Sequence, residues 1–431
     1  YRIALIGEAP GKDEVSAGEP FVGQSGKLLS ALLGKAGIVR EACFIGNVCQ
    51  HRPPNNDISL FDYGGPQITA GLSALAADLD RYKPNLCVLL GRTPLQAALG
   101  LSQISDWRGS LFTGIGVFAG RKCLAAYHPA ACLRQYEWTT ILVFDLKRAL
   151  KEGTTSTIKL PQRTLVCDFS PERIVRQCNL IRRQHLPIAC DIEGYVGDMS
   201  CISIATSASF AFTIPFSKRD HSSYYENEET EAQVWAALAG LLSDPTVPKV
   251  LQNSLYDRFV LQYSYGIIIQ NVVDDTMVKF HEAYAELEKA LAFQASILTD
   301  QPFYKSDRKS DDQATFYRYC AMDSAVTFEI NQRLDKILDD RQKEHYHFNV
   351  AMENPFLFME LHGISYDTRL AKERLREVNS AIYKLQYDLD KLSGFGLDEK
   401  LPRSVLEQQI RAKCCYVRDS STPKKAFAQE F

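Results

Sequence analysis

Short apolar segments alternate with amphipathic ones over residues 1–152, and this alternation restricts the possible folds more than any other feature. Apolar runs of strand length occupy residues 3–6, 42–48, 86–90 and 123–126, and helical periodicity occupies residues 26–36, 72–79 and 140–150. Strands that alternate with helices form a parallel sheet, because each crossover helix returns the chain to the same end of the sheet. We therefore predict a parallel α/β sheet with loops for ligands at the strand carboxyl ends.

The rest of the sequence predicts a linker, a second α/β domain and a helical last part. Residues 153–162 continue a polar, unpatterned stretch and are interpreted as the linker. Residues 163–342 form the second predicted domain, in which apolar runs at 188–192, 201–205 and 211–214 indicate a meander. Residues 343–431 are predicted to be helical and charged, with an amphipathic stretch over 370–392. The predicted fold class is thus multidomain α/β.

Composition excludes some classes of protein. The 431 residues are 45% hydrophobic and 23% charged, which is typical of a globular chain, and no apolar run reaches the ~20 residues of a membrane span. The net charge of −3 excludes a purely electrostatic nucleic-acid coat. The 12 cysteines form no CxxC pair, so we expect buried free thiols in a reducing cytoplasm. The chain begins at Tyr1 rather than Met, and we expect a fragment.

Polar side chains follow three of the predicted strands. Glu8 follows the first strand, Asn47 ends the second, and His128 follows the last. The glycines around Glu8 do not make a phosphate loop, because Asp13 stands where a phosphate loop has Ser or Thr. Since the carboxyl ends of parallel strands share one edge, these side chains predict a ligand pocket there.

These residues, together with the stretches GEPFVG (18–23), LLGRT (89–93) and WRG (107–109), resemble the family 4 uracil-DNA glycosylases. The resemblance covers about the first 150 residues and implies a pocket for a uracil flipped out of DNA. It implies that Asn47 reads the edge of the base, Phe21 stacks on the ring, and His128 hydrogen-bonds O2 of the leaving uracil. An unpaired buried amide can discriminate between bases by roughly 10⁴–10⁵.

The same resemblance implies further contacts around the pocket. Glu8 and Glu14 flank it, and one of the two positions the attacking water or stabilises the sugar cation. The backbone of Glu8 and Ala9 is expected to face the base. An alternative is a module that senses uracil without excising it.

A 4Fe–4S cluster belongs to this family, but we predict none in this chain. His51 stands where a cysteine is expected before Arg-Pro-Pro, Gly71 occupies the last cluster position, and Cys49 is out of register. A cluster without enough thiolates cannot be held.

Acidic residues recur at three places in the second predicted domain. Asp191 and Glu193 end an apolar strand, and their i, i+2 spacing places both carboxylates on one face. Asp257 lies near a helix start and Asn253 precedes it by four residues, facing the same way. Tyr319 and Asp323 lie on one face of a later helix.

In this order the three patterns resemble the DEDD 3′–5′ exonucleases of the Tyr subtype, and DTM (275–277) and LEKALA (287–292) resemble the proofreading domain of family A DNA polymerases. The resemblance implies two Mg²⁺ or Mn²⁺ ions, held by carboxylates, that promote phosphodiester hydrolysis. Tyr319 would orient the water. The implied metal ligands are Asp191, Glu193, Asp257 and Asp323, with Asn253 as a substrate contact.

The stretches MENP (352–355) and MELHGISYD (359–367) resemble the start of the family A polymerase region, and no palm signature follows. The order of the parts is that of certain large-phage DNA polymerases, so we expect a polymerase portion beyond this chain and a location in an infected bacterial cell. The implied partners are single-stranded 3′ ends and uracil-containing DNA, with no membrane. A stand-alone exonuclease of the ribonuclease D kind is the other alternative.

Overall fold

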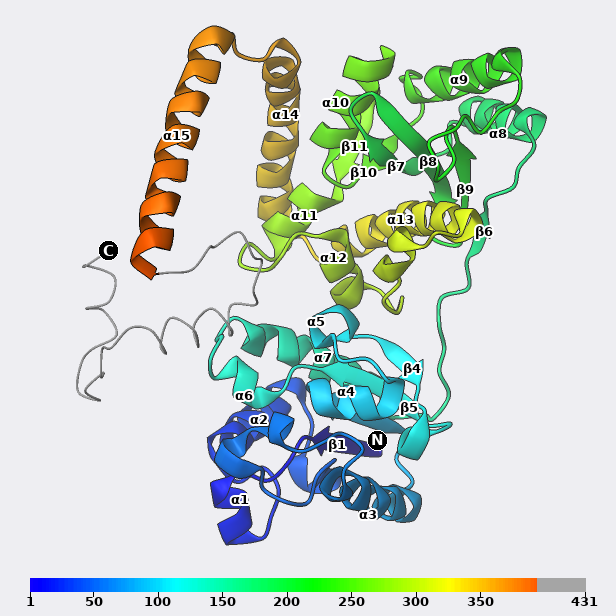
Figure 1. Ribbon diagram of the computed structural model, residues 1–431. Coiled ribbons are helices and arrows are strands. Elements are labelled where there is room, and N and C mark those ends of the chain that lie inside the picture. Colours follow the sequence, from blue (N-terminus) through cyan, green and yellow to red (C-terminus); the bar gives the residue numbers. More distant parts are fainter. Residues whose placement is uncertain (394–431) are drawn as a thin grey trace. The chain divides into compact units, whose positions relative to one another are not determined.

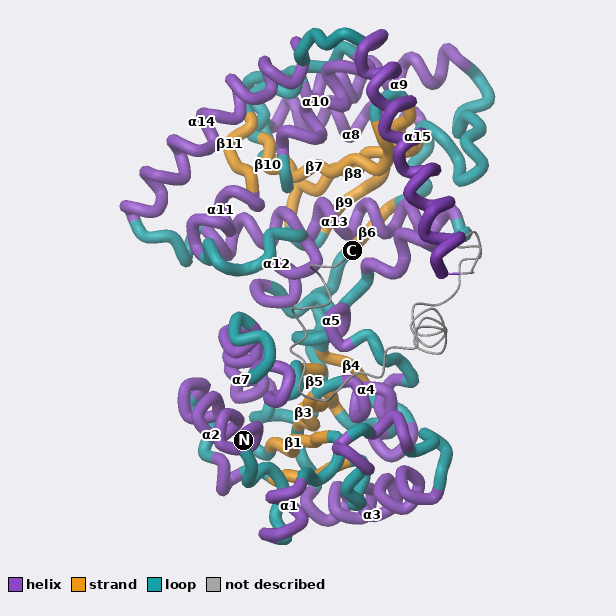
Figure 2. The backbone as a smooth tube through the Cα atoms, turned by 60° about the vertical axis from the view of Figure 1, so that its left-hand side comes forward, coloured by secondary structure: helices purple, strands orange, loops and turns teal. Residues whose placement is uncertain are grey.

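Two separate β-sheets organise residues 1–361 in the computed structural model, which describes residues 1–393 (Figure 1). Figure 2 shows the strands of each sheet gathered together and flanked by helices. Residues 1–361 form one compact unit, and a second unit begins at His362. The last part of the predicted third domain, residues 394–431, lies outside the described residues.

The first sheet has five strands in the order β2-β1-β3-β5-β4. The parallel α/β prediction is confirmed for the four predicted strands, and the sheet has a further strand, β4, which no sequence pattern predicted and which pairs antiparallel with β5. The physical reason is that β4 is a short edge strand that returns to its neighbour without a crossover helix. The bounds are β1 Ile3–Gly7, β2 Phe44–Asn47, β3 Leu86–Leu90, β4 Leu111–Thr113 and β5 Lys122–Ala126.

Helices cover both faces of this sheet, as the alternation of side chains along β1 requires. Ile3 and Leu5 join the hydrophobic cluster of α2 and α7, whereas Ala4 and Ile6 join that of α3 and α4. The helices are α1 Lys12–Ala17, α2 Gln24–Ala36, α3 Pro66–Tyr82, α4 Arg92–Leu99, α5 Ile104–Trp107, α6 Pro129–Cys132 and α7 Trp138–Glu152, with short 3₁₀ turns η1 Arg40–Ala42, η2 Pro54–Asn56, η3 Ile58–Leu60 and η4 Gly116–Phe118.

The second sheet has six strands in the order β11-β10-β7-β8-β9-β6. The predicted meander is confirmed, because β7, β8 and β9 pair antiparallel in sequence, while β6, β10 and β11 join in parallel. The strands are β6 Thr164–Val166, β7 Ile188–Tyr195, β8 Asp198–Ser207, β9 Phe210–Pro215, β10 Lys249–Leu251 and β11 Val272–Asp275. The helices are α8 Pro171–Gln184, α9 Glu228–Leu242, α10 Ser254–Tyr265, α11 Thr276–Ala283, α12 Leu291–Leu298, η5 Lys305–Lys309 and α13 Gln313–Leu334.

Helix α13 is fixed on the second sheet by buried hydroxyl groups. The Ser203 hydroxyl on β8 donates to the carbonyl of Cys320 at 2.7 Å, and the Thr213 hydroxyl on β9 donates to the carbonyl of Tyr317 at 2.7 Å. Both hydroxyls are fully buried. A buried hydroxyl needs its partner, so these bonds fix the height and rotation of α13 on the sheet.

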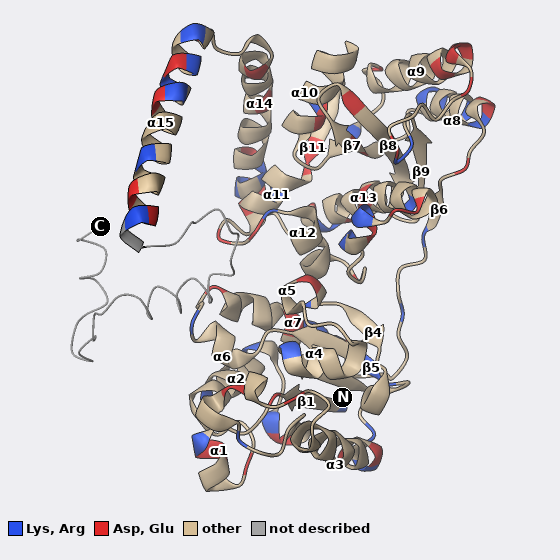
Figure 3. Cartoon of the chain, viewed as in Figure 1, with Lys and Arg blue, Asp and Glu red and all other residues tan. Residues whose placement is uncertain are grey.

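The helical end of the described chain consists of α14 (Asp340–His362) and α15 (Thr368–Ser393), which confirms the helical prediction there. Charged side chains of both signs recur along α15 (Figure 3). No helix among residues 1–393 combines the length and apolar character needed to cross a bilayer. Within the same residues ten cysteines are free thiols, and eight of these are buried.

Candidate functional site

A pocket of about 210 Å³ opens at the carboxyl ends of the first sheet. It brings together all the residues that the sequence assigned to a base pocket: Glu8, Ala9, Glu14, Phe21, Asn47 and His128. Sequence reasoning missed the rest of the lining, which is Pro10, Gly11, Ser25, Pro53, Asn56 and Ala130. Three of them, Ser25, Asn56 and Ala130, lie in helices, the other three lie in loops, and none was assigned a role in the pocket from the sequence.

Phe21 lies in the pocket wall in a left-handed backbone conformation, with φ of 57°. The Arg40 guanidinium donates to the carbonyls of Pro20 and Phe21, each at 3.0 Å, and so holds the loop. A Cβ added at Gly7 would lie 2.5 Å from both the Asn47 amide oxygen and the Phe21 ring. Gly7 therefore permits the close approach of Phe21 and Asn47, and strain at Phe21 is compensated by the surrounding contacts.

His128 presents its ring to the pocket next to Phe21, with ring centroids 5.6 Å apart. Its Nδ1 accepts a hydrogen bond from the Ala130 amide at 3.1 Å. Desolvation lowers the pKa of His128 to about 4. The imidazole is therefore neutral at pH 7, and because Nδ1 is an acceptor, the proton resides on Nε2, which can donate to a ligand.

The two glutamates of the pocket have different partners. The Glu14 carboxylate accepts from the amides of Gly11, Val22 and Gly23 at 2.9–3.1 Å. Although partial burial acts to raise it, these hydrogen bonds hold the pKa of Glu14 below its ordinary value. Glu14 thus fixes the backbone that follows Phe21 and links it to the loop at Gly11. Glu8 instead accepts a hydrogen bond from the Thr93 hydroxyl of α4.

The residues at the expected cluster positions do not fit an iron–sulfur cluster. A Cβ at Gly71 would lie 2.2 Å from the carbonyl oxygen of Val48, so α3 packs where a ligand side chain would stand. His51 is exposed, and the buried Cys49 thiol donates to the carbonyl of His51 at 3.3 Å. Burial raises the pKa of Cys49, which disfavours the thiolate that iron requires. The absence of a cluster stays a prediction.

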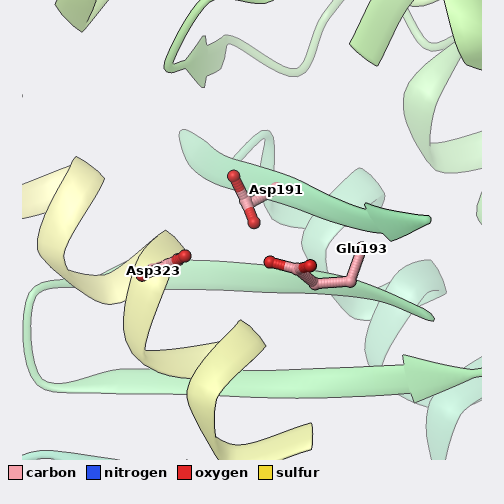
Figure 4. A group of neighbouring side chains, drawn as sticks. All are labelled: Asp191, Glu193 and Asp323. Carbon is pink, nitrogen blue, oxygen red and sulfur yellow. The ribbon is translucent and has the colours of Figure 1, made fainter. Parts of the chain in front are cut away.

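Three carboxylates converge at the second sheet. Asp191 and Glu193 on β7 and Asp323 on α13 have oxygens that all lie within 4.8 Å of one another. Figure 4 shows the three side chains pointing toward a common space between strand and helix. Desolvation, followed by repulsion from Asp323, raises the pKa of Asp191 well above its usual range. Burial also raises the pKa of Glu193.

Asp257 and Asn253 lie differently from the sequence expectation. Asp257 lies beside the three carboxylates rather than within the group, and its carboxylate accepts from the Ile192 amide at 3.2 Å. Burial raises the pKa of Asp257 to about 8. Asn253 precedes α10 in a left-handed conformation with φ of 62°, so the helical four-residue spacing to Asp257 does not apply. Asn253 lines another pocket, together with Asp275 and Glu353.

The donor set fits a hard divalent cation. Its ligands are carboxylate oxygens only, which Mg²⁺ and Mn²⁺ prefer, and without a cation the like charges repel and raise each other's pKa values. Asp191, Glu193 and Asp323 therefore make the candidate metal centre.

Side chains that the sequence did not single out surround this centre. The Tyr304 hydroxyl donates to Asp323 at 2.5 Å, and the Lys305 ammonium contacts Asp323 at 2.6 Å and the Tyr319 hydroxyl at 3.0 Å. Arg308 contacts Glu193 at 3.2 Å. The shared contact with Lys305 agrees with the prediction that Tyr319 and Asp323 lie on one face of their helix. No signal marked Lys305, since it is one of several charged residues in a polar segment.

Comparison with known proteins gives two family matches. The uracil DNA glycosylase superfamily matches residues 1–148, and a 3′–5′ exonuclease family matches residues 174–339. The type-4 uracil-DNA glycosylase of Archaeoglobus fulgidus is 38% identical over 136 residues, covering 30% of this chain and 66% of that protein, just under two thirds. The type-4 uracil-DNA glycosylase of Thermotoga maritima is 35% identical over 153 residues, covering 34% of this chain and 76% of that protein.

Similar solved structures include the catalytic core of RRP6 from Trypanosoma brucei, with 18% identity, a TM-score of 0.36, and coverage of 46% of this chain and 54% of that chain. RNase D of Escherichia coli has 16% identity and a TM-score of 0.35, with coverage of 47% of this chain and 52% of that chain. The first sheet and its pocket lie in one matched region, and the second sheet, apart from β6, lies with its carboxylates in the other. Since 76% of the Thermotoga protein is covered at 35% identity, this chain belongs to the uracil-DNA glycosylase superfamily, and a 3′–5′ exonuclease domain follows in the same polypeptide.

Proposed function

We propose that this chain excises uracil from DNA at the first pocket and removes 3′-terminal nucleotides at the carboxylate centre. The observation that carries the first activity is that Asn47, Phe21 and His128 line one pocket. The observation that carries the second is the convergence of Asp191, Glu193 and Asp323. Each site belongs to its own sheet, so the two activities are separable by mutation.

The first pocket suits recognition of a pyrimidine edge. The amide of Asn47 can donate to uracil O4 and accept from N3–H, whereas cytosine presents the opposite pattern at these positions. Asn47 is 7% exposed, so a mismatched base leaves its polar atoms without water as well as without a partner. Phe21 covers the face of the ring.

Bond cleavage at this pocket requires stabilisation of the departing base. The bond from N1 to C1′ breaks, the electron pair leaves with uracil, and water adds to C1′. The neutral His128 donates from Nε2 to O2, where negative charge develops. The Glu14 carboxylate is bound to backbone amides. Glu8 is therefore the carboxylate that positions the attacking water or stabilises the sugar cation.

At the second site a phosphodiester is hydrolysed. Water adds to the phosphorus, and the bond to the 3′ oxygen of the preceding nucleotide breaks. Divalent cations, when bound, supply activation of the water and stabilisation of the leaving oxygen. Asp191, Glu193 and Asp323 would hold them with Asp257 alongside, and Tyr319 would orient the water.

A duplex containing a single uracil tests the first activity. Incubation with the protein in EDTA, followed by alkali, should cleave the strand at the uracil, and Asn47→Ala should abolish this cleavage. Retained binding of the uracil duplex without cleavage would support a sensor and contradict excision.

A 5′-labelled single strand tests the second activity. Mn²⁺ or Mg²⁺ should support stepwise loss of 3′ nucleotides, EDTA should stop it, and Asp191→Ala should abolish it while leaving uracil release intact. RNA of the same sequence is the comparison substrate, since a strong preference for RNA would favour the ribonuclease D alternative. Loss of both activities in Asp191→Ala would contradict two separate sites.

We also propose that the chain is normally attached to a DNA polymerase. The support is the resemblance of residues 352–367 to the start of a family A polymerase region. The reading frame of the gene beyond Phe431 tests it, and a stop codon directly after Phe431 would contradict it.

A further inference from the structure

A lysine side chain reaches the carboxylate centre from outside the three sequence motifs. Lys305 begins η5, and its side chain is only 22% exposed. Its ammonium lies 2.6 Å from one oxygen of Asp323 and 3.0 Å from the hydroxyl oxygen of Tyr319. The same ammonium lies 4.9 Å from the centroid of the Tyr319 ring. Lys305 thus contacts both residues that α13 contributes to the site.

The second oxygen of Asp323 is also occupied. The Tyr304 hydroxyl, from the residue preceding Lys305, donates to it at 2.5 Å. Tyr304 and Asp323 are both buried. Two successive residues therefore hold one carboxylate by both oxygens. Arg308 differs from Tyr304 and Lys305, because its side chain is 61% exposed where it contacts Glu193.

The hydrogen bond to Tyr319 has a directional consequence. Because the ammonium can only donate, the Tyr319 oxygen is the acceptor in this pair. The phenolic proton is then left for another acceptor, and rotation of the hydroxyl is restricted. A hydroxyl with a fixed direction can orient a water molecule at a smaller entropic cost than a free rotor.

We propose that Lys305 is a positioning residue for the exonuclease reaction, which fixes the Tyr319 hydroxyl and offsets the negative charge beside Asp323. The proposal rests on the exonuclease function proposed above. Lys305 acts through Tyr319, so its contribution exists only while that hydroxyl is present. Because it competes electrostatically with a divalent cation at Asp323, its removal does not weaken metal binding.

The test uses the full chain and the variants Lys305→Met, Lys305→Arg and Lys309→Met. Lys309 is the matched control, because it belongs to the same short helix and is exposed. The measurements are calorimetric titration with Mn²⁺ alone, and the rate of 3′-nucleotide release from a labelled single strand at saturating Mn²⁺.

We expect Lys305→Met to lower the maximal rate roughly 10- to 100-fold, as misplacement of reacting groups does, with unchanged or tighter Mn²⁺ binding. Lys305→Arg should recover part of the rate, and Lys309→Met should behave as wild type. In a Tyr319→Phe background, Lys305→Met should change the rate less than about threefold, since interacting residues are not additive.

Several results would overturn the proposal. A Lys305→Met rate equal to or above wild type would mean that the lysine is a mere counter-ion. Weaker Mn²⁺ binding would mean that it only supports the fold of the ligands, and a change confined to KM would mean that it binds DNA phosphate. Full loss in the Tyr319→Phe background would exclude action through Tyr319. An inactive wild type would instead refute the exonuclease function itself, and this proposal with it.

Discussion

Under the proposed function, base discrimination at the first pocket depends on Asn47. Replacement by Asp keeps the shape but removes the donor to O4, and a buried carboxylate would face an acceptor. We expect Asn47→Asp to lower kcat/KM for uracil release by roughly 10³-fold or more. Single-turnover assays on a uracil duplex measure this, with the exposed Asn55→Asp as the control. A loss below tenfold would contradict readout by the amide.

His128 gives the pocket a defined pH behaviour. Since desolvation lowers its pKa to about 4, the folded protein binds fewer protons at this site than the unfolded chain between pH 6.5 and 4. Its effect on stability is therefore nil above pH 6.5 and becomes destabilising as the pH falls toward 4. In ¹⁵N-histidine spectra we expect His128 to stay neutral down to pH 5, with Nδ1 unprotonated. Titration near pH 6.5 would contradict the pocket geometry.

At the scale of residues, the sequence predicted which side chains lie together where their spacing matches the repeat of a strand or a helix. Asp191 and Glu193 could be paired because a strand repeats every two residues, and Tyr319 could be paired with Asp323 because a helix repeats near four. The helical spacing of four residues did not apply to Asn253, because this residue precedes its helix in a left-handed conformation. Lys305 could not be predicted, since only the folded chain brings it to Asp323.

At the scale of elements, α13 delivers two site residues and depends on polar contacts with the sheet. Thr213→Val removes the additional hydrogen bond to the Tyr317 carbonyl, and the loss of one intramolecular hydrogen bond costs about 0.5–1.5 kcal/mol. We expect a loss of unfolding free energy in that range in urea, and a slower exonuclease because Tyr319 and Asp323 shift. Thr213→Ser keeps the hydroxyl and should lie close to wild type. Equal destabilisation by both variants would show that the methyl group, not the hydrogen bond, matters.

Elements with strong periodicity were predicted, and elements defined by packing were not. The meander and the strands at residues 86–90 and 123–126 followed from apolar runs, and the structure contains these two strands as β3 and β5. The antiparallel β4 is only three residues long, too short for a visible pattern. The segment of η5 is polar throughout, so its approach to the carboxylates depends on tertiary contacts alone.

At the scale of the whole molecule, residues 1–361 form one unit, in which side chains of the first domain contact the segment around α12 beyond the predicted linker. Arg108 and Asp145 form a fully buried ion pair, and Arg108 also donates to Ser296 of α12 at 2.6 Å. Arg148 donates to the carbonyls of Ile297 and Thr299. These contacts hold residues 296–299, which precede Tyr304 and Lys305 of the carboxylate centre in the chain.

A further pair of contacts joins the first domain to this segment close to the carboxylate centre. The amide of Phe303 donates to the Ser110 hydroxyl at 3.0 Å, and the rings of Phe303 and Trp107 lie 5.7 Å apart. Tyr304 and Lys305 follow directly in the chain. The first domain thus supports the backbone from which the carboxylate centre receives two of its contacts.

Arg148→Ala tests this support. The substitution removes the donors to the carbonyls of Ile297 and Thr299 and leaves the residues of both sites unchanged. We therefore expect exonuclease activity to fall several-fold, while uracil release stays within twofold of wild type. Hydrogen exchange should increase in residues 299–309. Lys147→Ala, an exposed neighbour on α7, is the control. If exchange increases there without a change in exonuclease rate, the segment is braced but its position does not limit catalysis, and the coupling inferred between the two domains is wrong.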